Sequence, residues 1–194
     1  MSNSLKALLK EIEQFGHDHD TMPSNRSGRM LNITHDTGEF LAVLVRAMGA
    51  RRILEVGTSN GYSTLWLADA ARAIDGRVTT IEMSAAKVAL ARANFARGAL
   101  ADRIDQVEGE AGHFLAGCAD AAYDLVFLDS ERAAYLGWLA QLARILRPGG
   151  LIVVDNATSH AQELAPFMQA LRADALWSTS LVPVGKGEFL ATKH

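Results

Sequence analysis

Residues 54–63 read Leu54-Glu55-Val56-Gly57-Thr58-Ser59-Asn60-Gly61-Tyr62-Ser63, with two glycines between an apolar run and a helical segment. Glycines at such a point let the backbone turn tightly and let a ligand approach without meeting a Cβ. A helix starting near Ser63 would offer free N–H groups and a positive dipole end to an anionic group. Glu82 closes the next apolar run, where an acid can accept hydrogen bonds from ribose hydroxyls. The stretch therefore predicts a site for a ligand that contains a nucleoside.

Around this stretch, short apolar runs alternate with helical segments. The runs lie at residues 53–56, 78–81, 104–107, 125–128 and 151–154, and the helices are expected at 63–73, 84–96, 111–115 and 135–146. Continuous apolar runs are typical of a parallel sheet covered by helices on both faces. Two further runs flank Gly185-Lys186-Gly187, a hairpin signal that makes the last strand antiparallel. We therefore predict an open α/β sheet with its ligand beyond the carboxyl ends of the strands.

The N-terminal part precedes this pattern and differs from it. Apolar residues at helical spacing predict a helix from about Ser4, and residues 16–28 are expected to form a polar loop. The histidines and aspartates of residues 17–20 are interpreted as part of that solvated loop. Asp36 and Glu39 have the spacing of a capping box and are expected to open a second helix.

Composition restricts the class of protein. The chain has 194 residues, of which 49% are hydrophobic and 21% charged, as in one globular domain spanning 1–194. Its net charge of −3 argues against a dedicated nucleic-acid binder. Cys118 is the single cysteine, so no internal disulfide can form and a reducing compartment is expected. With no apolar run near the ~20 residues of a membrane span and charges close to Met1, we expect a cytoplasmic protein.

The glycine spacing excludes two common phosphate-binding motifs. A dinucleotide fingerprint needs further glycines where Ser59 and Tyr62 stand, which also disfavours an NAD-dependent oxidoreductase. A P-loop needs a lysine and a hydroxyl residue after the last glycine, but Tyr62 follows Gly61.

Four segments in order resemble one family. They are the E-x-G-x-x-x-G-Y-S run from Glu55, T-I-E ending at Glu82, the segment 123–129 ending in Asp129, and R-P-G-G-L-I-V-V-D-N ending at Asn156. The set is similar to class I S-adenosylmethionine-dependent methyltransferases, and more narrowly to the small-molecule O-methyltransferases that include catechol and caffeoyl-CoA O-methyltransferases. The resemblance implies a Rossmann-like fold with a seven-stranded, mostly parallel sheet, an antiparallel last strand and helices on both faces. It also implies a homodimer.

The resemblance further implies which residues hold the methionine end of S-adenosylmethionine. Glu55 and Gly57 would shape the pocket there, together with the backbone of Thr58. Ser63 would hold the amino-acid carboxylate, a role that suits a hydroxyl at a helix N-terminus. Asp129 would reach toward the methionine amine.

The nucleoside end is assigned in the same way. Glu82 would bind the ribose, and Ala111 matches the adenine-side position of the family. Residues 1–35 would form an N-terminal helix and a lid segment, in which Ile33 touches the cofactor through its backbone.

Asp129, Asp155 and Asn156 form a second group of candidate residues at adjacent strand ends. Their carboxylate and amide oxygens suit Mg²⁺, Mn²⁺ or Ca²⁺ and not zinc. The resemblance implies a divalent cation there that binds the two hydroxyls of a catechol and lowers their pKa. Arg132 stands where the family usually has a catalytic lysine. An arginine stays charged, so it can stabilise a phenolate but is a poor base. The alternative interpretation of Arg132 is a residue on a solvated helix face.

These residues predict methyl transfer from S-adenosylmethionine to a hydroxyl of a small, aromatic, catechol-like acceptor, with Asp129 and Arg132 as the catalytic residues. Two alternatives remain open. One is a tRNA-modifying methyltransferase on the same fold, which the net charge disfavours. The other is a non-catalytic protein that binds S-adenosylmethionine, which the arginine leaves open. The acceptor and the hydroxyl that is methylated do not follow from the sequence.

Overall fold

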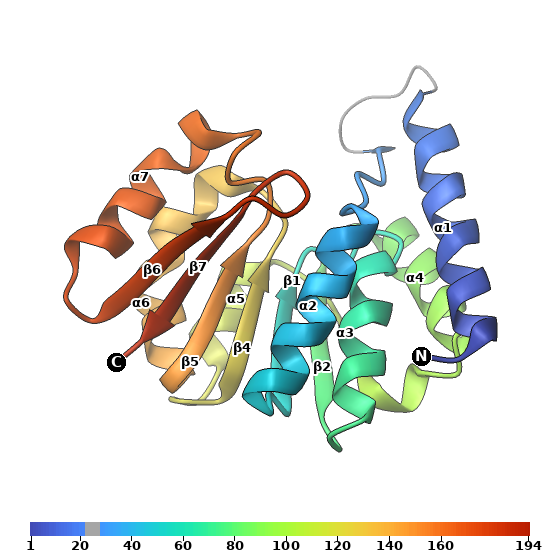
Figure 1. The fold of residues 1–194 in the computed structure, drawn as a ribbon, viewed down its shortest axis with the longest axis horizontal. Helices are drawn as coiled ribbons and strands as arrows, with labels where there is room; N and C mark the ends of the chain where they lie inside the picture. Colours follow the sequence, from blue (N-terminus) through green and yellow to red (C-terminus); the bar gives the residue numbers. More distant parts are fainter. Residues whose placement is uncertain (22–27) are drawn as a thin grey trace.

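The computed structural model describes residues 1–21 and 28–194, and a seven-stranded sheet runs through its centre (Figure 1). The strand order is β3-β2-β1-β4-β5-β7-β6, with the first five strands parallel and β7 antiparallel to both β5 and β6. The strands are β1 (Arg52–Val56), β2 (Arg77–Glu82), β3 (Ile104–Glu108), β4 (Tyr123–Leu128), β5 (Leu146–Val154), β6 (Trp177–Val182) and β7 (Glu188–Lys193). The predicted mostly parallel sheet and its antiparallel hairpin are confirmed.

Helices cover both faces of the sheet because successive residues of a buried strand point to opposite sides. On β4, Leu125 and Phe127 pack toward the N-terminal helices, whereas Val126 and Leu128 pack toward the C-terminal ones. The first group is α1 (Asn3–Thr21), α2 (His35–Met48), α3 (Tyr62–Arg72) and α4 (Ala85–Arg97). The second is α5 (Ala111–Gly117), α6 (Tyr135–Ile145) and α7 (Ala161–Ala173). Short 3₁₀ turns, η2 (Ala101–Arg103) and η3 (Arg132–Ala134), precede β3 and α6.

The N-terminal predictions need two corrections. The loop expected at residues 16–28 is helical as far as Thr21. Gly16 packs against Asn32, and Asp20, in the last turn of α1, accepts the N–H groups of Met30 and Leu31. Residues 22–27 of that prediction lie outside the described residues. The second helix begins at His35, after Thr34, and not with a capping box at Asp36.

Helix α7 has no counterpart among the sequence predictions. Its buried residues recur at helical spacing, at Leu164, Phe167, Met168 and Leu171, but Pro166 lies inside the helix and masks the pattern. The helix covers the α5–α7 face of the sheet beside β6.

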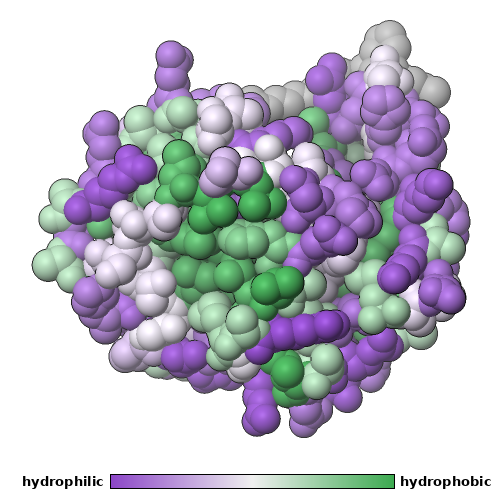
Figure 2. Space-filling model, in the orientation of Figure 1, coloured by the Kyte–Doolittle hydropathy of each residue, from purple (hydrophilic) through white to green (hydrophobic). Residues whose placement is uncertain are grey.

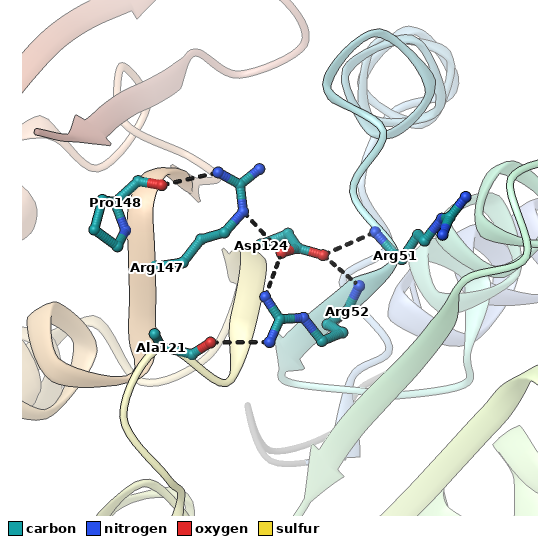
Figure 3. A network of polar contacts seen from close by, with 6 residues as sticks. All are labelled: Arg51, Arg52, Ala121, Asp124, Arg147 and Pro148. Atoms are coloured by element: carbon teal, nitrogen blue, oxygen red, sulfur yellow. Dashed lines mark hydrogen bonds and ion pairs between the residues drawn. The ribbon is translucent and has the colours of Figure 1, made fainter.

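At the amino edge of the sheet, Asp124 fastens three parallel strands together (Figure 3). Its carboxylate accepts the backbone N–H groups of Arg51 and Arg52 at 2.9 and 2.8 Å. It also accepts hydrogen bonds from the guanidinium groups of Arg52 and Arg147 at 2.7 and 2.8 Å. Burial opposes ionisation, but these donors hold the pKa of Asp124 below its ordinary value. These contacts give the amino edge a structural role, whereas ligands of open α/β sheets bind beyond the carboxyl ends of the strands. In the described part of the chain, no helix has the length and apolar character to cross a membrane.

Candidate active site

The parallel register brings the ends of β1, β4 and β5 to one level. Val56 pairs with Leu128, the N–H of Asp129 donates to the carbonyl of Val56 at 3.0 Å, and that of Asp155 donates to Leu128 at 3.1 Å. A Cβ on Gly57, whose φ is +107°, would lie 2.1 Å from the carbonyl oxygen of Asp129. The glycine was expected to make room for a ligand. In the structure, the position that a Cβ would take is filled by the backbone of Asp129, at the end of the neighbouring strand β4.

A cleft opens beside these strand ends, between the segment 30–33 and the turn that leads into α3. Its lining residues are Met30, Leu31, Asn32, Ile33, Gly57, Thr58, Ser59, Asn60, Tyr62, Ser63 and Asp129. Five of the predicted cofactor residues are in this set: Ile33, Gly57, Thr58, Ser63 and Asp129. Three others, Glu55, Glu82 and Ala111, lie outside the lining, and the first two contact it through hydrogen bonds.

Glu55 lies beneath the cleft and is completely buried. Its carboxylate accepts hydrogen bonds from the hydroxyls of Ser63 and Thr80 at 2.6 and 2.5 Å, and from that of Thr64. Burial raises the pKa of Glu55 to about 7, although the three hydroxyl donors oppose the rise. Glu55 therefore positions the first turn of α3, and with it Ser63, and does not itself face the cleft.

Through hydrogen bonds, Glu82 links the end of β2 to the turn that follows β1. One oxygen accepts the N–H of Ser59 at 2.9 Å, and the other accepts the N–H groups of Met83 and Ser84 at 3.0 Å. A carboxylate has about four acceptor positions, so this fixed group can still accept hydrogen bonds from ligand hydroxyls. Ala111 lies beyond it, at the start of α5, where Glu110 caps the helix.

The segment 30–33 is held over the cleft from two sides. Asp20, near the end of α1, accepts the N–H groups of Met30 and Leu31 at 2.7 and 2.8 Å. From the other side, the hydroxyl of Ser59 donates to the carbonyl of Met30 at 2.7 Å. Leu31 and Ser59 have φ of 51° and 49°, a strained conformation that is often kept at binding sites. The solvated-loop interpretation of residues 17–20 is therefore wrong: they belong to α1, and Asp20 holds the segment 30–33. No periodic signal in the sequence identifies the role of Asp20.

Asp129, Asp155 and Asn156 meet at the other side of the strand ends, and we call these three residues the cation corner. The amide nitrogen of Asn156 lies 3.4 Å from Oδ1 of Asp129 and contacts Oδ2 of Asp155. Burial first, and then the charges of Asp155 and Glu55, raise the pKa of Asp129 well above its ordinary value, while Arg132 and Lys186 oppose the rise.

The donor types, two buried carboxylates and a side-chain amide, are those that a hard divalent cation prefers. In this structure the amide nitrogen of Asn156 faces both carboxylates. Among residues 1–21 and 28–194, no group of three or more His, Cys, Asp and Glu side chains is arranged as a metal site. The cation corner contains only two such side chains, so the prediction of a metal there remains untested.

Arg132 is 9% exposed, which excludes the solvated helix face proposed as the alternative for it. It begins η3, and its Nε donates to Glu163 of α7 at 2.9 Å. Its charge also reaches Asp129. The side chain is therefore a buried cation beside the corner, fixed by an ion pair between η3 and α7.

A buried glutamate beside the corner was missed by sequence analysis. Glu188 is completely buried at the start of β7, and Thr37 of α2 donates to it at 3.0 Å. Burial, then the adjacent Asp155, raises the pKa of Glu188 to about 10. Because β7 is antiparallel, its first residue lies at the carboxyl edge of the parallel strands. The sequence signal that could have identified Glu188 is a glutamate at the start of an apolar strand.

Comparison with known proteins gives a family match over the whole chain. An O-methyltransferase family model matches residues 1–194. A catechol O-methyltransferase of Mycobacterium tuberculosis is 42% identical over 127 residues, which are 64% of this chain and 56% of that protein. The match thus spans little more than half of that relative. A putative O-methyltransferase of Mycobacterium bovis is 33% identical over 83% of this chain and 77% of that protein.

Solved structures have the same fold. An O-methyltransferase from Bacillus cereus, solved in complex with S-adenosylhomocysteine, superimposes with a TM-score of 0.80 and is 26% identical. The superposition covers 97% of this chain and 91% of that one.

Proposed function

Because the chain belongs to the O-methyltransferase family, we propose that it transfers a methyl group from S-adenosylmethionine to a hydroxyl of a small aromatic acceptor. A divalent cation at the cation corner would assist, and one domain spanning 1–194 would carry the whole site. The observation that carries this proposal is the adjacency of two sites at one sheet edge. The cleft under the segment 30–33 and the cation corner share Asp129.

The proposed cofactor lies in the cleft; the Bacillus cereus relative was solved in complex with S-adenosylhomocysteine, which supports the choice of cofactor. Ser63 receives the amino-acid carboxylate at the N-terminus of α3, with Glu55 fixing its hydroxyl. Glu82 accepts hydrogen bonds from the ribose, and Ala111 lies on the adenine side. The backbone of Ile33 closes the cleft from above.

Asp129, Asp155 and Asn156 would hold the cation. When bound, a divalent cation lowers the pKa of a coordinated hydroxyl and so supplies an oxyanion nucleophile at neutral pH. Arg132 remains charged and stabilises the oxyanion electrostatically, since a guanidinium does not act as a base. The remaining contribution of the chain is to align the acceptor oxygen with the methyl group, which converts an intermolecular reaction into an effectively intramolecular one.

Methyl transfer from labelled S-adenosylmethionine to a panel of vicinal diphenols, with Mg²⁺ or with a chelator, tests the proposal. We expect transfer with Mg²⁺ and its loss with the chelator. Asp155→Asn should lower the rate and raise the Mg²⁺ concentration needed for half-maximal transfer, because one carboxylate ligand is lost. Transfer that is insensitive to the chelator would refute the role of the cation. Binding of S-adenosylmethionine without transfer to any member of the panel would refute the catechol-like acceptor.

We also propose that two copies of the chain form a homodimer. Figure 2 shows a continuous hydrophobic area on this face, in the region of β7 and the adjoining side of α2. On α2, Val43 is 63% exposed, and Leu44 is partly buried, as is Leu190 on β7. Sedimentation of the wild-type chain should give a dimer, and Val43→Glu should shift it toward the monomer. A monomeric wild type would contradict this assignment.

A further inference from the structure

The turn between β6 and β7 is clamped beside the cation corner. The N–H of Gly185 donates to Oδ2 of Asp36, in the first turn of α2, at 3.1 Å. The carbonyl oxygen of Lys186 accepts the N–H groups of Thr158 and Ser159, both at 3.1 Å. The last two residues lie in the turn that follows β5 and Asn156, so Lys186 is tied to the same chain segment that forms the corner.

Steric contacts fix the turn further. A Cβ on Gly185 would lie 2.2 Å from the hydroxyl oxygen of Thr37, and one on Gly187 would lie 2.1 Å from that of Thr158. Both glycines have positive φ, +56° and +91°, which other residues rarely adopt. The backbone on either side of Lys186 therefore packs directly against α2 and the turn after β5, and the position of Lys186 at this rim is set by its neighbours.

The side chain of Lys186 is an exposed cation without a fixed counter-ion. Within residues 1–21 and 28–194, no carboxylate lies within ion-pair distance of its ammonium. Arg132, the other cation whose charge reaches Asp129, is held by Glu163. The corner thus has one engaged, buried cation and one exposed cation on its rim.

We propose that Lys186 selects acceptors with a negatively charged substituent, such as a carboxylate on the aromatic ring, by pairing with that substituent at the rim of the corner. The inference rests on the proposed function, in which the acceptor hydroxyls go to the buried corner. A group that pairs with the exposed Lys186 must belong to the part of the acceptor that stays near solvent. An ammonium is a compact charge with three donors and suits a carboxylate in that position. The predicted acceptor class is therefore a vicinal diphenol that is also an aromatic acid.

Equilibrium binding tests this selection without relying on turnover. The affinities of protocatechuate (a catechol with a ring carboxylate) and of catechol itself are measured by calorimetry with S-adenosylhomocysteine and Mg²⁺ present. We expect the wild type to bind the acid about tenfold more tightly, as for a charge-assisted hydrogen bond. Lys186→Met should abolish the difference, Lys186→Arg should restore part of it, and added salt should reduce it. Lys10→Met, which removes an exposed lysine from α1, is the matched control and should keep the wild-type ratio.

Equal affinities of the wild type for the two diphenols, or an unchanged ratio in Lys186→Met, would overturn the inference, as would failure of the wild type to bind either diphenol. Methyl transfer measured in parallel separates the two proposals. Lys186-dependent binding of the acid without methyl transfer would refute the proposed function alone. Methylation of both diphenols, with the same ratio of affinities for them in the wild type and in Lys186→Met, would refute only the proposed selection by Lys186.

Discussion

The buried carboxyl group of Glu55 should make the stability of the protein depend on pH in a predictable direction. Glu55 is completely buried, and its pKa rises from an ordinary 4.5 to about 7. Between these two values the folded state binds more protons than the unfolded state, so stability falls as the pH rises. The stability that the raised pKa of Glu55 contributes is fully present below pH 4.5 and is lost as the pH passes about 7. The difference between the two pKa values corresponds to about 3 kcal/mol.

Glu55→Gln removes the titration and keeps the size of the side chain. Its amide can still accept from one of the hydroxyls of Ser63, Thr64 and Thr80 and donate to another. Urea unfolding of wild type and variant between pH 4.5 and pH 8 gives the difference in unfolding free energy at each pH. Glu188, whose pKa burial raises to about 10, is present in both proteins and cancels in this difference.

We expect the wild type to lose about 3 kcal/mol relative to Glu55→Gln across this range, with the steepest loss between the two pKa values and little further change near pH 8. A difference that stays constant within about 0.5 kcal/mol would refute the reasoning. It would mean that the three hydroxyl donors compensate fully for the burial of the charge.

Three further predictions follow from contacts at the carboxyl edge. Asp20→Asn should weaken S-adenosylhomocysteine binding about tenfold in calorimetry, because two charge-assisted hydrogen bonds to the segment 30–33 become weaker; unchanged affinity would contradict its positioning role. Gly57→Ala should lower the unfolding free energy by about 3 kcal/mol or more, because the new Cβ would meet the backbone of Asp129. The control Gly49→Ala, where φ is also positive but the space is open, should lower it by only about 1 kcal/mol. Equal losses in urea unfolding would contradict the close backbone contact. A double-mutant cycle of Arg132→Met and Glu163→Gln should give a coupling of about 1 kcal/mol, and additive losses would show that the ion pair contributes nothing.

The sheet was predictable from sequence because its strands are short apolar runs buried on both faces, and their carboxyl ends meet at one edge. That reasoning also placed Gly57, Asp129 and Asp155 together, as the register of β1, β4 and β5 requires. Helix α7 was missed because Pro166 interrupts its pattern.

The polar contacts around the site could not be predicted from local patterns. Asp20 contacts Met30, ten residues further along the chain, and Glu188 contacts Thr37 across 151 residues. Such hydrogen bonds depend on tertiary packing, which neither residue spacing nor helical periodicity reports. The capping box at Asp36 was wrong because the helix begins one residue earlier, at His35, and Oδ2 of Asp36 accepts the N–H of Gly185 in the β6–β7 turn.

Calorimetric titration with S-adenosylhomocysteine tests the central assignment, that the cleft under the segment 30–33 binds the cofactor. The wild type should bind one molecule per chain, and Glu82→Gln should weaken binding about tenfold or more, because a charged acceptor for the ribose hydroxyls becomes neutral. Glu110→Gln alters a similar glutamate, which caps the N-terminus of α5 through backbone N–H groups, and should leave the affinity within about twofold. Absence of saturable binding to the wild type, or equal affinities of the wild type and Glu82→Gln, would contradict the assignment.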